Sequence, residues 1–182
     1  MDKVRRMQLE KVMVNESAYR PTREPVFTET MQIGIVVRDL DATMRRYAED
    51  YGIGPWQVFE VTPENAPDLR HDGQPVKGSA RSAVAMVGSV MWELTEPLDD
   101  NTLFARFLAE KGEGVHHLAV ATPNFHEVIA EHTKGGTVLP LSGSFTGIDV
   151  AYLPTDHTLG VILEVFSGMP GADTESDATD NA

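Results

Sequence analysis

The sequence of 182 residues contains no cysteine. Disulfide bonds and thiolate chemistry are therefore excluded, and any metal ion must be held by nitrogen and oxygen ligands. The sequence also lacks an apolar run close to the roughly 20 residues that a membrane-spanning helix needs. The opening stretch MDKVRRMQLEKVMVNES is charged throughout, without the apolar core of a secretory signal. These absences favour a cytoplasmic protein outside the membrane.

Positive charge is scarce. Fifteen Lys and Arg residues face 28 Asp and Glu, which gives a formal net charge of −13. Nucleic acids are disfavoured as partners because phosphate contacts need clustered Lys and Arg. A small anionic ligand stays possible, since a few arginines can reverse the field within one cleft.

An internal repeat occupies most of the chain. Each copy reads as a strand, an amphipathic helix and three further strands. In the first copy we expect these elements at 31–37, 40–51, 56–61, 80–87 and 89–95. Asp39 is expected to cap the first helix. In the second copy we expect them at 117–121, 125–134, 137–141, 149–153 and 160–166, with Asn124 as the helix cap.

The repeat predicts an α+β fold of two tandem βαβββ modules. The Pro-, Gly- and Asp-rich segment 62–78 is expected to be a long functional loop in the first module. The complete division that we predict is an N-terminal arm (1–26), a first module (27–97), a connecting helix (98–112), a second module (113–168) and a disordered acidic tail (169–182).

Four polar residues occupy matching positions in the two copies. Gln32 aligns with His117, and Glu93 aligns with Glu164. VMWELTEP and VILEVFSG each place a glutamate in the middle of an apolar strand. An unpaired carboxylate is costly to bury there. Two such glutamates at equivalent positions predict a shared divalent cation, which would bring the formal charge of the group close to zero.

Four segments, taken in their order along the chain, resemble the vicinal-oxygen-chelate superfamily: QIGIVVRDLDATMRRYAEDYG, WELTEPL, GEGVHHLAV and GVILEVF. This superfamily includes glyoxalases, methylmalonyl-CoA epimerases, extradiol dioxygenases and bleomycin-resistance proteins. The resemblance spans roughly residues 28 to 168. It implies a cupped mixed sheet around one metal ion, with Gln32, Glu93, His117 and Glu164 as ligands.

This ligand set, with a single histidine, looks like that of glyoxalase I and implies Zn, Co, Ni or Mn. The extradiol dioxygenases of this superfamily instead bind iron with two histidines and one carboxylate. Proteins of the bleomycin-resistance type lack a complete ligand set. The leading hypothesis is therefore a metal-dependent isomerase, epimerase or lyase that stabilises the enolate of a carbonyl substrate. A dioxygenase and a non-catalytic binding protein are the alternatives.

The resemblance also assigns roles. Glu164 is the first candidate for the catalytic base and Glu93 the second. Methylmalonyl-CoA epimerases carry another glutamate on the preceding strand, where this chain has Ser82. The substrate is expected to be a carbonyl compound such as an acyl-CoA, and the protein a homodimer.

Further candidates concern substrate binding and the neighbour of the histidine ligand. Four residues are candidates for contacting the substrate: Trp56, Trp92, Ser82 and His157. His116 should point away from His117, because successive side chains alternate across a strand.

Overall fold

The computed structural model describes residues 21–167. The predicted acidic tail and most of the predicted arm lie outside this range. The first part of the chain forms β1 (Glu29–Val36), α2 (Leu40–Tyr51), β2 (Gln57–Val61), β3 (Arg70–His71), β4 (Gln74–Pro75), β5 (Ala80–Val87) and β6 (Val90–Pro97). After α3 (Leu103–Lys111) come β7 (Gly114–Ala121), α4 (Phe125–Thr133), β8 (Leu141–Phe145), β9 (Ile148–Leu153), α5 (Asp156–Leu159) and β10 (Ile162–Phe166).

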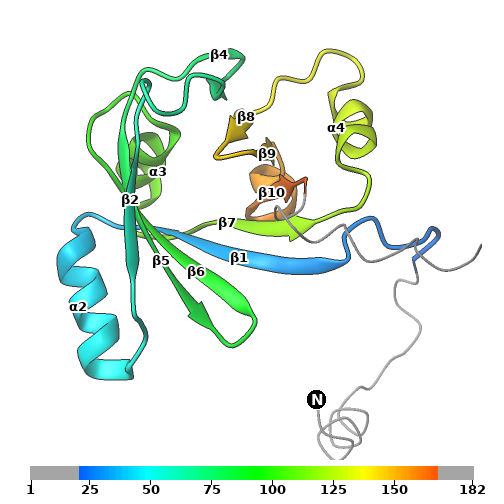
Figure 1. Cartoon of the computed structure of the whole chain (residues 1–182). Coiled ribbons are helices and arrows are strands. Elements are labelled where there is room, and N and C mark those ends of the chain that lie inside the picture. Colours follow the sequence, from blue (N-terminus) through cyan, green and yellow to red (C-terminus); the bar gives the residue numbers. More distant parts are fainter. Residues whose placement is uncertain (1–20, 168–182) are drawn as a thin grey trace, which may run out of the picture.

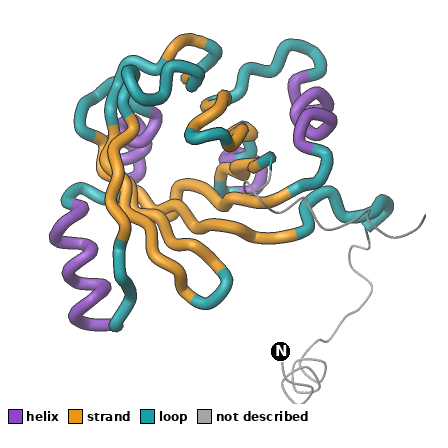
Figure 2. The backbone as a smooth tube through the Cα atoms, in the orientation of Figure 1, coloured by secondary structure: helices purple, strands orange, loops and turns teal. Residues whose placement is uncertain are grey.

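All ten strands form one mixed sheet in the order β2-β5-β6-β1-β7-β10-β9-β8-β3-β4. The order β1-β6-β5-β2 of the first half is repeated as β7-β10-β9-β8 in the second. β1 pairs in parallel with β6 and β7 in parallel with β10, while β1 and β7 join the halves in antiparallel pairing. The predicted βαβββ repeat and the α+β class are therefore confirmed. The sheet curls around an open side (Figures 1 and 2).

Helices α2 and α4 cover the outer face of the curled sheet at its two ends (Figure 1). The side chain of Asp39 accepts a hydrogen bond from the backbone N–H of Ala42 at 2.8 Å, as the sequence predicted, and Gly52 ends the helix. Leu40 is fully buried and packs with Leu94 of β6. Within residues 21–167 no helix is long and apolar enough to cross a membrane.

The second helix of the repeat begins differently from the expectation. Asn124 stands at the N-cap position of α4, but its side chain makes no capping hydrogen bond. Its backbone N–H instead donates to Thr122 Oγ1 at 3.3 Å. In α3 the hydroxyl of Thr102 accepts from the backbone N–H of Ala105 at 3.0 Å, so that helix has a side-chain cap.

The prediction of a strand at 137–141 was wrong. The strand is β8, Leu141–Phe145, which has the sequence LSGSF. Gly is depleted in strands, and Gly together with Ser is typical of a turn. Gly143 nevertheless suits this position because a Cβ there would lie 2.2 Å from the backbone oxygen of Asp68. Close packing of the segment 62–78 thus overrides local propensity.

The expected long loop 62–78 contains the short hairpin of β3 and β4. Arg70 and His71 pair with Ser142 and Leu141 of β8, so an insertion of the first module extends the edge of the second. Phe59 of β2 also stacks on Phe145 of β8, with ring centroids 6.3 Å apart. The edge strand β2 of the first half and strand β8 of the second half therefore contact each other on this side of the molecule.

Candidate metal centre

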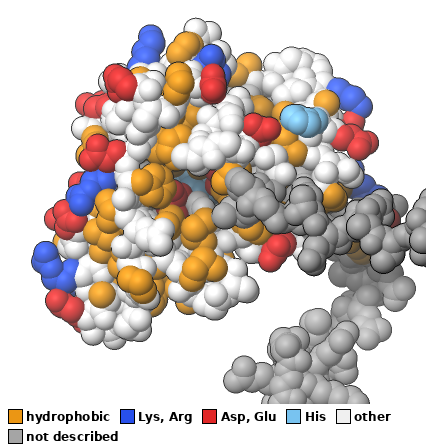
Figure 3. Space-filling view, in the orientation of Figure 1, with side chains coloured by type: hydrophobic (Ala, Val, Ile, Leu, Met, Phe, Trp, Pro, Cys, Tyr) orange, Lys and Arg blue, Asp and Glu red, His pale blue; other side chains and the backbone are white. Residues whose placement is uncertain are grey.

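The four candidate ligands lie on the four adjacent central strands β6, β1, β7 and β10. Gln32, His117 and Glu164 are 4%, 1% and 5% exposed, and the Glu93 side chain is 13% exposed. Gly34 is the register partner of both Glu93 and His117, which brings the two halves of the repeat together. In Figure 3, acidic and histidine atoms are visible in a hollow bordered by hydrophobic side chains.

The side chains of these four residues contact one another directly. Gln32 Nε2 donates to Glu93 Oε2 at 2.7 Å and lies 3.1 Å from His117 Nε2. His117 Nε2 also lies 3.4 Å from Glu93 Oε2 and 3.2 Å from Glu164 Oε2. Although close to the ring, Glu164 Oε2 accepts no hydrogen bond and is buried. A buried carboxylate oxygen without a hydrogen-bond partner is stabilised by a positive charge, so this observation fits a bound cation.

Burial and charge shift the acid–base equilibria of the cluster. Desolvation, opposed by the charge of His117 and reinforced by that of Glu93, raises the pKa of Glu164 to about 7. Desolvation lowers the pKa of His117, but the two carboxylates outweigh it and the net shift is upward. The cluster therefore retains protons beside its two carboxylates, in the place where a cation would also be stabilised.

The cluster is closed by its own hydrogen bonds. Gln32 turns its amide nitrogen toward Glu93 and His117. An amide ligates a cation through its oxygen, so Gln32 would have to rotate its amide group to become a ligand. Accordingly, residues 21–167 contain no group of three or more His, Asp or Glu side chains already arranged around a metal position. The donor types suit a cation, but binding one requires these partners to separate.

His116 does not point away from His117, so that prediction was wrong. Gly34 pairs with His117 and the next residue, Ile35, pairs with Val115, which leaves His116 as the extra residue of a β-bulge. A bulge interrupts the alternation of side chains across the strand. The Nδ1 atoms of the two histidines consequently lie 3.0 Å apart. His116 is 3% exposed, and burial together with nearby positive charge lowers its pKa to about 3.

Tyr152 of β9 is a neighbour of the cluster that the sequence did not indicate. Its hydroxyl lies 3.4 Å from His117 Nδ1. Burial and the two carboxylates raise its pKa well above the usual value, so it is a neutral phenol at neutral pH. The repeat pattern could not identify it, because a tyrosine in an apolar strand reads as an ordinary core residue.

The four candidates for substrate contact are dispersed. Trp56 and Trp92 pack against Tyr47 of α2, with ring centroids 5.9 and 5.7 Å away, and so lie toward the helix-covered face. His157 is 93% exposed on α5. Ser82 shares the inner face with Glu93, and its hydroxyl lies 3.0 Å from that of Thr95. Of the four, only Ser82 lies on the inner face near the candidate ligands.

Residues 31–152 match the Glyoxalase/Bleomycin resistance protein/Dioxygenase superfamily. Since this match covers more than half of the chain, the protein belongs to that superfamily, as its sequence segments suggested. Among curated protein sequences, none matches the chain.

Among solved structures, the chain is similar to methylmalonyl-CoA epimerases. A Streptomyces coelicolor epimerase in complex with 2-nitronate-propionyl-CoA shares 27% identity over 77% of this chain and 96% of its own, with a TM-score of 0.58. A methylmalonyl-CoA epimerase in complex with methylmalonyl-CoA and NH4+ shares 27% identity over 77% and 94%, with a TM-score of 0.58. The Mycobacterium tuberculosis epimerase shares 19% identity over 82% and 94%, with a TM-score of 0.60. That last likeness concerns the fold alone.

Proposed function

We propose that the protein is a metal-dependent isomerase that moves a proton on the carbon next to a carbonyl group, with an acyl-CoA or a related carbonyl compound as substrate. The observation that carries the proposal is the convergence of Gln32, Glu93, His117 and Glu164 in one buried cluster. Similarity to epimerases, one of which is complexed with methylmalonyl-CoA, supports the substrate class.

A divalent cation would be held by these four side chains. They offer two carboxylates, one imidazole and one amide oxygen, a set without sulfur that suits Zn, Co, Ni or Mn. When bound, the cation supplies Lewis acidity that stabilises negative charge on a substrate oxygen. The two carboxylates and the cation would also neutralise one another, which lowers the cost of their burial.

Glu164 is the candidate base. A carboxylate whose pKa lies near the working pH is partly deprotonated and still basic enough to take a proton. Burial raises the pKa of Glu164 toward that range. Its Oε2 accepts no hydrogen bond and is free to take a proton from a substrate carbon. Glu93 is second because its Oε2 already accepts a hydrogen bond from Gln32.

The inner face departs from the resemblance at Ser82. The hydroxyls of Ser82 and Thr95 are paired where epimerases were expected to carry another glutamate. A neutral hydroxyl pair is a weak proton acceptor. The proposal therefore assigns both proton removal from the α-carbon and proton return to a neighbouring atom of the enolate to Glu164, which favours an isomerase with one carboxylate base over an epimerase that uses two.

Metal titration tests the first part of this proposal. Chelator-treated protein is titrated with Zn, Co, Ni and Mn by isothermal calorimetry. We expect one equivalent to bind, and Glu93→Gln or Glu164→Gln to weaken binding by about 10-fold or more. Glu96→Gln is the matched control, because Glu96 contacts the backbone N–H of Leu40 instead of the cluster. The metal assignment fails if none of the four ions binds, or if both cluster variants bind like the parent.

Proton exchange tests the chemistry. Loaded protein is incubated with methylmalonyl-CoA in heavy water, and deuterium at the α-carbon is followed by mass spectrometry. Exchange should occur with the parent and fall by about 100-fold or more in Glu164→Gln, because a general base contributes that much. Oxygen uptake on catechols would instead favour a dioxygenase. Tight ligand binding without exchange would favour a binding protein.

A further inference from the structure

The contacts of His117 Nε2 do not by themselves fix which ring nitrogen carries its proton. Gln32 Nε2 donates to Glu93 Oε2 and lies 3.1 Å from His117 Nε2. The amide nitrogen only donates, and a cation would also need the lone pair of Nε2, so both place the proton of a neutral His117 on Nδ1. Glu93 Oε2 and Glu164 Oε2, at 3.4 and 3.2 Å from the same Nε2, only accept and favour the opposite tautomer, so the partner of Nδ1 decides between the two. That Nδ1–H needs an acceptor, because an unsatisfied buried donor is costly.

Two groups lie within reach of His117 Nδ1. The nearer is Nδ1 of His116 at 3.0 Å, and the other is the hydroxyl of Tyr152 at 3.4 Å. The ring of His116 is held edge-on by Phe104 and Phe107 of α3, with centroid distances of 5.2 and 4.9 Å. Its orientation toward His117 is therefore fixed by packing.

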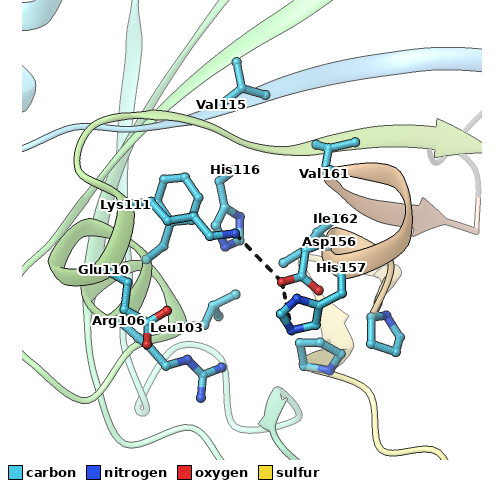
Figure 4. A pocket seen from close by; sticks show the side chains of 14 residues that line it. Leu103, Arg106, Glu110, Lys111, Val115, His116, Asp156, His157, Val161 and Ile162 are labelled. Carbon is cyan, nitrogen blue, oxygen red and sulfur yellow. Dashed lines mark ion pairs between the residues drawn. The ribbon is translucent and has the colours of Figure 1, made fainter.

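The ring of His116 also faces a cleft that His117 does not line. This cleft of about 380 Å³ lies between α3 and α5 and is bordered by Lys111 and Asp156 (Figure 4). With its proton on Nε2, His116 keeps the lone pair of Nδ1 for His117.

We propose that His116 is a positioning residue for the candidate ligand His117. The bulge in β7 places its Nδ1 as the acceptor for His117 Nδ1–H, which keeps the lone pair of His117 Nε2 available to a cation held together with Glu93 and Glu164. Partners of this kind set the tautomer and ring orientation of a histidine that binds metal. The inference deepens the proposed function and rests on it where metal binding is concerned.

Two variants separate the acceptor from the packing. His116→Phe keeps a ring against Phe104 and Phe107 but removes the acceptor, whereas His116→Asn keeps an acceptor near the same place. Affinity for Zn and Co, measured by calorimetry, should fall about 10- to 100-fold in His116→Phe and stay within about threefold in His116→Asn. Tyr152→Phe is the comparison variant, and its affinity should match the parent. Thermal unfolding of the metal-free proteins accounts for any change in stability.

The tautomer of His117 gives a readout without metal. In ¹⁵N spectra of metal-free protein, recorded where the ring is neutral, we expect the Nδ1–H form in the parent and in His116→Asn, and a mixture in His116→Phe. An unchanged tautomer and affinity in His116→Phe would overturn the proposal, as would a larger loss in Tyr152→Phe. If the parent binds no metal, the proposed function fails, while the ¹⁵N spectra still decide the role of His116.

Discussion

Gly34 lies directly against the imidazole ring of His117. A Cβ added at Gly34 would come within 1.9 Å of His117 Cε1 and 2.1 Å of its Nε2. The two residues are register partners on β1 and β7, the strands that join the two halves of the sheet. The missing side chain on one strand therefore creates the space for the candidate ligand on the other.

Gly34→Ala should displace the ring of His117. The added methyl group cannot share space with the ring, so the free energy of unfolding should fall by about 1–3 kcal/mol. Affinity for Zn or Co should fall by about 10-fold or more, because the ring leaves Glu93 and Glu164. Chemical denaturation and calorimetry measure the two effects.

A double-mutant cycle identifies the cause. In a His117→Ala background the ring is absent, so Gly34→Ala should cost little stability. An equal loss of stability in both backgrounds would assign the effect to the strand backbone and contradict a steric conflict with the ring.

The repeat made much of this fold predictable. Glu93 and Glu164 stand out in the sequence because carboxylates are rare inside apolar strands, and the register then selects Gln32 and His117. Helix α2 was equally predictable, because Asp39 marks its start and Gly52 marks its end. In these places local propensity and tertiary packing agree.

The remaining features depend on contacts between distant segments. The bulge that turns His116 toward His117 exists only in the pairing of β7 with β1. Strand β8 was misplaced because LSGSF has weak strand propensity, while its pairing with β3 comes from the other half of the repeat. Neither contact leaves a periodic signal in its own segment, so pattern analysis could not find them.

The stability of metal-free protein should fall as pH rises. The pKa of Glu164 is raised from 4.5 to about 7, so the folded state binds this proton more tightly than the unfolded state. The resulting loss of stability develops as pH rises between about 4.5 and about 7 and reaches about 3 kcal/mol at most. The pKa of His117 is also raised, and its contribution disappears in the same direction.

Urea denaturation with a chelator, between about pH 5 and about pH 8, measures this dependence. Glu164→Gln removes the titrating carboxyl group and should flatten the curve. A parent protein whose stability rises over this interval would show that the buried cluster does not hold its protons as described. Saturating Zn should suppress the fall, because the cation replaces the protons and binds only the folded cluster.

Trp56→Ala should act on stability and leave the cluster unchanged. The indole packs on Tyr47, and its N–H donates to the backbone oxygen of Ile53 at 3.0 Å. Its loss should cost about 2–4 kcal/mol, because Trp56 is only partly buried. Denaturation and calorimetry on the same sample separate stability from affinity. Lost affinity for acyl-CoA at unchanged stability would instead support a substrate contact by Trp56.

Gly143→Ala should release the segment 62–78 from β8. Gly143 has a φ of 139°, and a Cβ there would lie 2.2 Å from the backbone oxygen of Asp68. The backbone of Asp68 has no flexible end that could yield, so we expect a loss of about 2–3 kcal/mol and faster proteolysis within 62–78. Metal affinity should stay near that of the parent, because the four candidate ligands lie on the central strands.

Gly147→Ala is the matched control for this variant. Gly147 also has a positive φ, 84°, but a Cβ there would meet no atom within 4 Å. It should therefore show only the cost of backbone strain, about 1 kcal/mol, and no new cleavage in 62–78. Equal protease sensitivity of the two variants would mean that strain alone loosens the segment. Cleavage confined to Gly143→Ala would show that the contact with Asp68 holds the two halves of the repeat together on this side.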